Sequence, residues 1–163
     1  MPTPEPDPHH GERRFDSPQQ EAFLNLWRTY DRLRQIEDQL FSRHDLTAQQ
    51  YNALRLLRAV RPAKAPTLYV ASRLVSRAPD ITRLLDKLHE RGLVDRERPA
   101  GNRRVVNIGI TKAGVDLLDK IAEEVLACAQ IQLGHLESAE VKTLIDLLRK
   151  ARQPHEPPGG EWG

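Results

Sequence analysis

The sequence predicts a mainly α-helical fold that carries one small β-hairpin. Aromatic residues make up only 5% of the chain, so the core must be built from Leu, Val, Ile and Ala, the composition of packed helices. Apolar residues recur every three or four positions in several long segments, which is the spacing of one face of a helix. One region, residues 93–110, contains two extended runs around a turn and supplies the hairpin.

The 163 residues suit one domain with two polar ends, because a single core grows to this size without splitting. Residues 1–18 are rich in proline and charge, and residues 153–163 are rich in proline and glycine. Neither end buries enough apolar surface to offset the entropy of ordering it. We therefore expect a disordered arm over 1–18, a folded body over 19–152 and a disordered tail over 153–163.

The sequence contains no secretory hydrophobic region and no apolar run near the roughly 18 residues that span a bilayer. The expected location is therefore cytoplasmic, without a membrane partner. Cys128 is the only cysteine, which excludes an intrachain disulfide and a cysteine-based zinc cluster. We expect no metal and no cofactor, because no metal-ligand motif is formed by the histidines, which are His9, His10, His44, His89, His135 and His155.

The first predicted helix spans residues 19–43 and the second begins at Thr47. Thr47 is a helix cap, and Gln50 reaches back toward it as in a capping box. Pro62 and Pro66 end the second helix, because proline lacks the N–H that the helical hydrogen bond needs. The apolar face of the first helix is formed by Phe23, Leu26, Trp27, Tyr30, Leu33, Ile36, Leu40 and Phe41.

A short helix over 67–74 and a helix over 79–91 come next. Pro79 fits the first turn of the latter, where its missing N–H costs nothing, and Gly92 ends it. The extended runs 93–98 and 104–110 enclose the turn 99–102 and form the hairpin. Thr111 caps a further helix that runs to about Leu133, and Ser138 opens the last helix.

Two short helices followed by a basic hairpin are the parts of a winged helix-turn-helix, which binds double-stranded DNA. Basic residues outnumber acidic ones between Arg73 and Arg104, whereas acidic residues are the majority from Lys112 to Lys150. A local basic segment in a chain of net charge +2 fits a surface that faces a polyanion.

Helix 79–91 is the expected recognition helix, with its N-terminal residues nearest the base edges of a major groove. Its first turn and the residues before it contribute Arg77, Asp80, Thr82 and Arg83. Arg83 is suited to guanine edges or phosphate, and Thr82 to phosphate. Asp80 either accepts a hydrogen bond from cytosine or only favours the helix N-terminus as an acid.

The hairpin tip places Asn102, Arg103 and Arg104 on a turn that fits a minor groove, whose negative potential attracts arginine.

Taken together, the motifs of this region resemble the MarR (multiple antibiotic resistance regulator) family. The resemblance covers roughly residues 19–152, and its motifs are LTAQQYNALRLL over 46–57, PDITRLLDKL over 79–88, ERGLV over 90–94, NRRVV over 102–106 and ITKAG over 110–114.

The resemblance implies a winged-helix repressor or activator that binds pseudo-palindromic DNA and is often released by small phenolic or other ligands; we expect a repressor. It also implies a DNA-binding core over about 44–111 and dimerisation helices over about 19–43 and 112–151. The wing of the family usually carries an aspartate where this chain has Asn102. An amide removes an ionic partner of Arg104 but still accepts a hydrogen bond.

Dimerisation has a second argument, because the first and last helices carry apolar stripes that one small core does not cover. A twofold dimer would place two recognition helices about one DNA turn, ~34 Å, apart. The alternative is that one protomer buries both helices.

Several residues permit two interpretations. Cys128 is either a redox sensor or a buried, unreactive thiol, and the apolar residues around it favour the second. Trp27, Tyr30 and Tyr51 either line a ligand pocket or pack in a core.

Two other classes of protein stay open as alternatives to a DNA-binding regulator. No nucleophile lies beside a base in a known motif, so an enzyme is not expected. A protein-binding adaptor on the same fold would not need Arg83, Arg103 and Arg104.

Overall fold

The computed structural model describes residues 15–78, 80–102 and 104–157. Its helices are α1 (Pro18–Ser42), α2 (Ala48–Val60), α3 (Thr67–Arg73), α4 (Ile81–Glu90), α5 (Lys112–Leu133) and α6 (Ser138–Arg152), followed by the short 3-10 helix η1 (Gln153–His155). Its strands are β1 (Ala65–Pro66), β2 (Val94–Glu97) and β3 (Asn107–Ile110). The predicted fold class, mainly helical with a β-hairpin, is confirmed.

The chain divides into two compact units, residues 1–35 and 36–163, so α1 begins in the first and ends in the second. Within the first unit most apolar side chains of α1 are exposed, with Phe23 and Trp27 at 62% and 63%, whereas Leu33 is half-buried. Their rings lie 6.4 Å apart at a tilted angle. The domain boundaries at residues 18 and 152 stay predictions.

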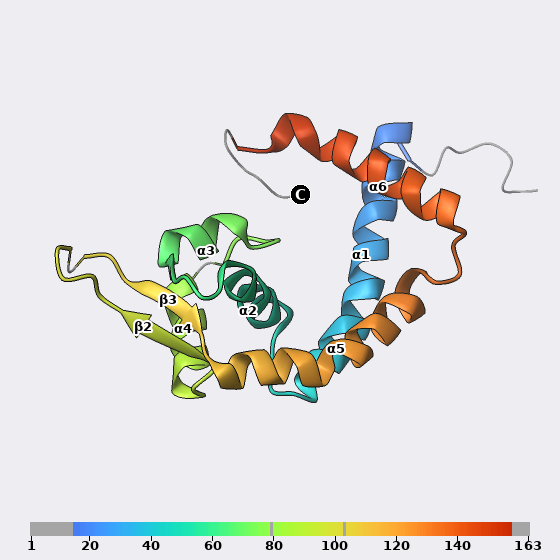
Figure 1. Ribbon diagram of the computed structural model, residues 1–163. Coiled ribbons are helices and arrows are strands. Elements are labelled where there is room, and N and C mark those ends of the chain that lie inside the picture. The colour runs from blue at the N-terminus through green and yellow to red at the C-terminus, as the bar shows by residue number, and fades with distance from the viewer. Residues whose placement is uncertain (1–14, 79, 103, 158–163) are drawn as a thin grey trace, which may run out of the picture. The chain divides into compact units, whose positions relative to one another are not determined.

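The three strands of the second unit form an antiparallel sheet in the order β1, β3, β2. Figure 1 shows β2 and β3 side by side, in a hairpin that projects beyond α2, α3 and α4. Val94 pairs with Ile110 and Glu97 with Asn107 at the two ends of the ladder. The hairpin is therefore confirmed and forms the wing of the predicted winged helix-turn-helix.

The strands are shorter than the predicted runs 93–98 and 104–110, and β1 was not predicted. The second strand of the hairpin, β3, starts only at Asn107. The N–H groups of Arg104 and Val105 both donate to Asn102 in a turn and therefore do not join the sheet. β1 has only two residues, one of them Pro66, too few to produce an alternating pattern.

Helix caps follow the sequence closely. Thr47 accepts a hydrogen bond from Gln50 N, and the Gln50 side chain accepts one from Thr47 N, which completes the predicted capping box. Thr111 caps α5 as predicted, and Gly92 follows α4 with a φ of 69°, a conformation that glycine adopts without strain. Pro79 lies outside the described residues, and α4 is capped by Asp80.

The core of the second unit lies between the sheet and the helices, and it fixes which side of α4 faces outward. Leu84, Leu85 and Leu88 of α4 are buried, whereas Thr82 and Arg83 are exposed. Among the described residues, the largest side chains with less than 2% exposure are Phe41, Leu54, Leu57, Val70, Leu85, Leu88, Val94, Ile108 and Ile121.

Helix α5 meets the sheet at a close contact around Thr111. The Thr111 N–H donates to the Leu93 carbonyl at 3.1 Å, and its hydroxyl donates to the Gly92 carbonyl at 2.6 Å. A Cβ added to Gly114 would lie 2.4 Å from the Leu93 carbonyl oxygen and 2.7 Å from Cγ1 of Ile110. The approach of α5 to β2 and β3 therefore requires glycine at this position.

Cys128 is buried in α5, as the second interpretation of this residue predicted. Burial raises the pKa of its thiol, the nearby Glu37 carboxylate raises it further, and Arg43 partly opposes them. Among the described residues, no helix is long and apolar enough to cross a membrane.

We expect Cys128 to react slowly with a thiol reagent at pH 8 in the folded protein and rapidly in urea, because the reactive thiolate is scarce and covered. Since the folded pKa lies above the ordinary value of 9.0, the unfolded thiol ionises first, so its ionisation lowers stability as the pH rises through 9.0. Time courses with a chromogenic disulfide follow this single thiol. Equal rates with and without urea would contradict its burial.

Candidate nucleic-acid interface

The N-terminus of α4 is organised by Asp80. Its Oδ1 accepts a hydrogen bond from the Arg83 N–H at 2.9 Å, so Asp80 is the N-cap of the helix. A carboxylate here also offsets the positive end of the helix dipole. This geometry supports the structural role of Asp80 over cytosine recognition, because one of its acceptor oxygens is already used.

The exposed side of α4 begins with Thr82 and Arg83 and continues through Lys87 one turn later. Arg77 is exposed in the link that precedes the helix. Lys87 was not among the predicted site residues, although its spacing of four from Arg83 places it on the same face. These side chains give the outer face of α4 hydroxyl and cationic donors.

The tip of the wing is a turn held by Asn102. Asn102 Oδ1 accepts from the Arg104 N–H at 3.1 Å, and the Asn102 N–H donates to the Pro99 carbonyl at 3.1 Å. The amide thus shapes the turn by accepting a backbone hydrogen bond, as the carboxylate of an aspartate at this position could also do. Arg104 is exposed, and Arg103 lies outside the described residues.

The basic residues of this region fall into two groups. Several are already bound within the protein: Arg96 pairs with Asp86, Arg73 stacks 4.5 Å from the Tyr69 ring, and Arg91 donates to the carbonyls of His44 and Asp45. Within the described ranges, no ion pair is formed by the second group, which is Arg77, Arg83, Lys87, Arg98 and Arg104. The second group lies on and before α4 and on the wing, so these are the cations available to a polyanion.

Comparison with known proteins identifies the family of the chain. The family model described as MarR family matches residues 46–106. The regulator PecS of Dickeya dadantii is 32% identical over 89 residues, which are 53% of this chain and 53% of PecS, so the chain spans about half of that relative. A crystallised MarR transcription factor from Planctomyces limnophilus is 54% identical, with a TM-score of 0.68 over 83% of this chain and 98% of that one.

The chain belongs to the MarR family. The fold match extends to Sco3205 of Streptomyces coelicolor, a MarR-family regulator crystallised with DNA. Its TM-score is 0.79 at 16% identity, over 90% of this chain and 93% of that one. The resemblance inferred from the motifs is thus confirmed over nearly the whole predicted body.

The aromatic residues proposed for a ligand pocket of this MarR-family protein lie in different units. Tyr51, in the second unit, is half-buried and stacks on Phe41 with centroids 4.5 Å apart. Burial is the main cause that raises the pKa of its hydroxyl. The core interpretation therefore suits Tyr51 better than a ligand contact does.

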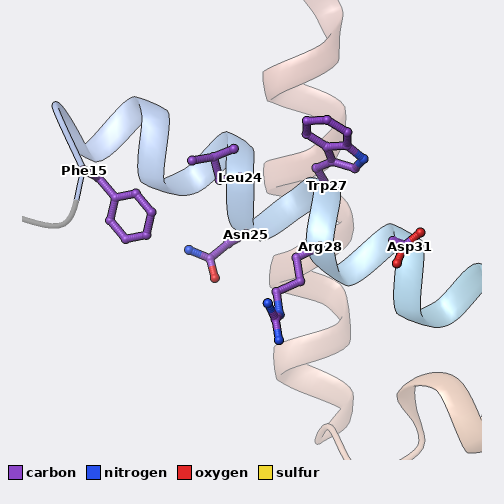
Figure 2. Close-up of a pocket in the computed structure, with 6 residues that line it drawn as sticks. All are labelled: Phe15, Leu24, Asn25, Trp27, Arg28 and Asp31. Atoms are coloured by element: carbon purple, nitrogen blue, oxygen red, sulfur yellow. The ribbon is translucent and has the colours of Figure 1, made fainter.

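Trp27 and Tyr30 lie in the first unit, where both are exposed. Trp27 borders a surface hollow of about 690 Å³, whose lining Figure 2 shows: Phe15, Leu24, Asn25, Trp27, Arg28 and Asp31. The hollow combines aromatic surface with one cation and one carboxylate. A ligand role for Trp27 and Tyr30 stays a prediction.

In the described part of the chain, no group of three or more His, Cys, Asp or Glu side chains is placed to hold a metal ion. His44 instead contacts Glu124 at 3.0 Å, and His89 contacts the Val94 carbonyl at 3.1 Å. His9 and His10 lie outside the described residues.

Proposed function

We propose that this MarR-family protein is a cytoplasmic, dimeric, sequence-specific DNA-binding transcription regulator that acts as a repressor. In this proposal α4 enters a major groove and the wing enters the adjacent minor groove. The contacts are assigned to Arg77, Thr82, Arg83, Asn102, Arg103 and Arg104, with Asp80 holding the helix start. Lys87 and Arg98 are added to this set.

One observation carries the proposal. Among the described residues of 73–104, Arg77, Arg83, Lys87, Arg98 and Arg104 form no side-chain ion pair or ring contact, and they lie on and before the exposed face of α4 and on the wing, while the other face of α4 is buried. A helix fits the major groove of B-DNA, and an arginine-bearing turn fits the minor groove. The structural match to a regulator crystallised with DNA supports the same placement. Membership in a family of transcription regulators supports a regulator over an enzyme.

The dimer is supported by two exposed apolar surfaces. In the first unit, Phe23, Leu26, Trp27 and Tyr30 are exposed along α1. In the second unit, α6 has no buried residue and exposes Ile145 and Leu147. Apolar stripes of this kind normally meet a partner, so we expect twice the chain mass of 18.6 kDa by light scattering after size exclusion.

A small-molecule effector is the regulatory part of the proposal. It would release the DNA by favouring a dimer whose recognition helices are wrongly spaced for the operator, which requires different affinities for the two states of the dimer. The hollow beside Trp27 is one place where such a molecule is expected.

The proposal is tested by binding of the purified protein to its own upstream DNA and to scrambled DNA of equal length, at several salt concentrations. We expect a clear preference for the upstream DNA and an affinity that falls steeply as salt rises, because phosphate contacts release counterions. Absence of binding to either DNA at low salt would refute the proposal of a DNA-binding regulator and would favour a protein-binding adaptor.

A further inference from the structure

The side chains of β2 alternate between two faces of the sheet, and each face carries an ion pair to another element. Asp95 and Glu97 share one face, and Arg96 points to the opposite one, as strand geometry requires. Both faces of the strand at the base of the wing are therefore attached to the body of the second unit.

On the first face, Lys64 reaches across the sheet. Lys64 precedes β1, which is separated from β2 by β3, yet its Nζ lies 3.2 Å from Asp95 Oδ2 and 3.1 Å from Glu97 Oε2. Hydrogen bonds to Glu97 and Asp95 raise the pKa of Lys64 above its ordinary value.

Gly109 of β3 makes room for this contact. It pairs with Asp95 in the ladder, and a Cβ added to it would lie 2.7 Å from Asp95 Oδ1 and 3.0 Å from Cγ of Lys64. The absence of a side chain on the middle strand therefore allows Lys64 to lie across it and connect the outer strands.

On the opposite face, Arg96 forms an ion pair with Asp86 of α4. Arg96 is only 29% exposed, and its Nε is buried without a hydrogen-bond partner among the described residues. Asp86 lies one turn after Thr82, so this ion pair joins the wing directly to the helix that carries Thr82, Arg83 and Lys87.

We propose that Lys64, Asp86, Asp95, Arg96 and Glu97 form a wing-root clamp that fixes the wing relative to α4 and thereby sets the selectivity for DNA. The inference rests on the proposed function. Two adjacent grooves must be entered at once, so a wing held in place before binding has less freedom to lose on binding. Arg96 and Lys64 are then positioning residues whose charges are used within the protein, although a count of basic residues would assign both to the DNA.

The ion pair between Asp86 and Arg96 permits a test that separates an effect on the position of the wing from an effect on the charge near the DNA. Asp86→Asn removes a negative charge near the DNA, so electrostatics alone predicts tighter binding to every DNA. The clamp instead predicts that Asp86→Asn and Arg96→Met each lower the ratio of operator to scrambled-DNA affinity about fivefold. It also predicts that the double variant loses no more than either single variant, because both remove the same ion pair.

The control is Asp116→Asn, which breaks the exposed Lys112–Asp116 pair on α5 and is expected to leave the ratio unchanged. The salt dependence gives a second readout: with Arg96→Met its slope stays that of the unmodified protein. A slope smaller by about one would mean that Arg96 contacts phosphate. That result, or an Asp86→Asn variant with an unchanged or higher ratio, would overturn the clamp.

Hydrogen exchange in the protein without DNA tests the clamp independently of the proposed function. We expect faster exchange of the backbone N–H groups of β2 and β3 in Arg96→Met than in the unmodified protein, at unchanged exchange in α2. Unchanged exchange in β2 and β3 would overturn the clamp even if the protein binds its operator. If the unmodified protein shows no preference for any DNA, the proposed function fails, and the selectivity role of the clamp fails with it.

Discussion

Replacing Gly114 by alanine is expected to destabilise the protein by about 2 kcal/mol, which lowers Tm by roughly 4–8 °C. The added Cβ would lie 2.4 Å from the carbonyl oxygen of Leu93, which is a backbone atom and cannot rotate away. Alanine favours a helix over glycine by up to about 1 kcal/mol, so the clash must exceed this gain for the prediction to hold. Thermal unfolding followed by circular dichroism measures the shift.

The matched control is Gly101→Ala at the wing tip. Apart from Gly101 itself and its two chain neighbours, no atom lies within 4 Å of the position of its Cβ, and its φ does not require glycine, so we expect a change within about 0.5 kcal/mol. An equal Tm for the two variants would show that α5 moves away from Leu93 at little cost. The close contact would then not be what fixes α5 on the sheet.

Replacing Arg83 by alanine is expected to weaken binding to the operator by about 1–3 kcal/mol, or roughly 5- to 150-fold, and to relax the preference at one base pair. Arg83 is exposed on the first turn of α4, and its backbone N–H donates to Asp80, which fixes the start of the helix. Fluorescence anisotropy against a set of single-base operator variants measures both effects.

The control is Lys120→Ala on α5, which removes the same charge from an exposed residue that is not assigned to the DNA. We expect less than a twofold change, as for a distant surface charge. If Arg83→Ala weakens binding equally on every sequence, Arg83 contacts phosphate. If it has no effect, α4 is not the recognition helix.

Local features of the fold could be predicted because they depend on residues close in sequence. The capping box of Thr47 and Gln50 and the cap at Thr111 each join residues three positions apart, so the chain specifies them without the rest of the molecule. The apolar spacing of α2, α4 and α5 fixes their buried faces in the same way. The outward positions of Thr82 and Arg83 follow from this spacing.

The ends of the strands were harder to predict because they depend on competing hydrogen bonds. Arg104 and Val105 are followed in sequence by β-branched residues, which favour a strand. Their N–H groups nevertheless donate to Asn102 and do not take part in the sheet. The two-residue strand β1 exists only because β3 offers it a partner. Neither outcome is visible in a pattern of apolar residues.

The sequence by itself determined the family, the order of the helices, the hairpin and the face of α4 that carries the DNA-binding candidates, because these depend on local spacing and short motifs. Only the tertiary structure decided which basic residues are free for DNA. Arg91 and Arg96 resemble Arg83 in sequence, but their partners, the carbonyls of His44 and Asp45 and the carboxylate of Asp86, come from other elements. An arginine binds whichever acceptor the fold brings within reach, and local spacing does not reveal that acceptor.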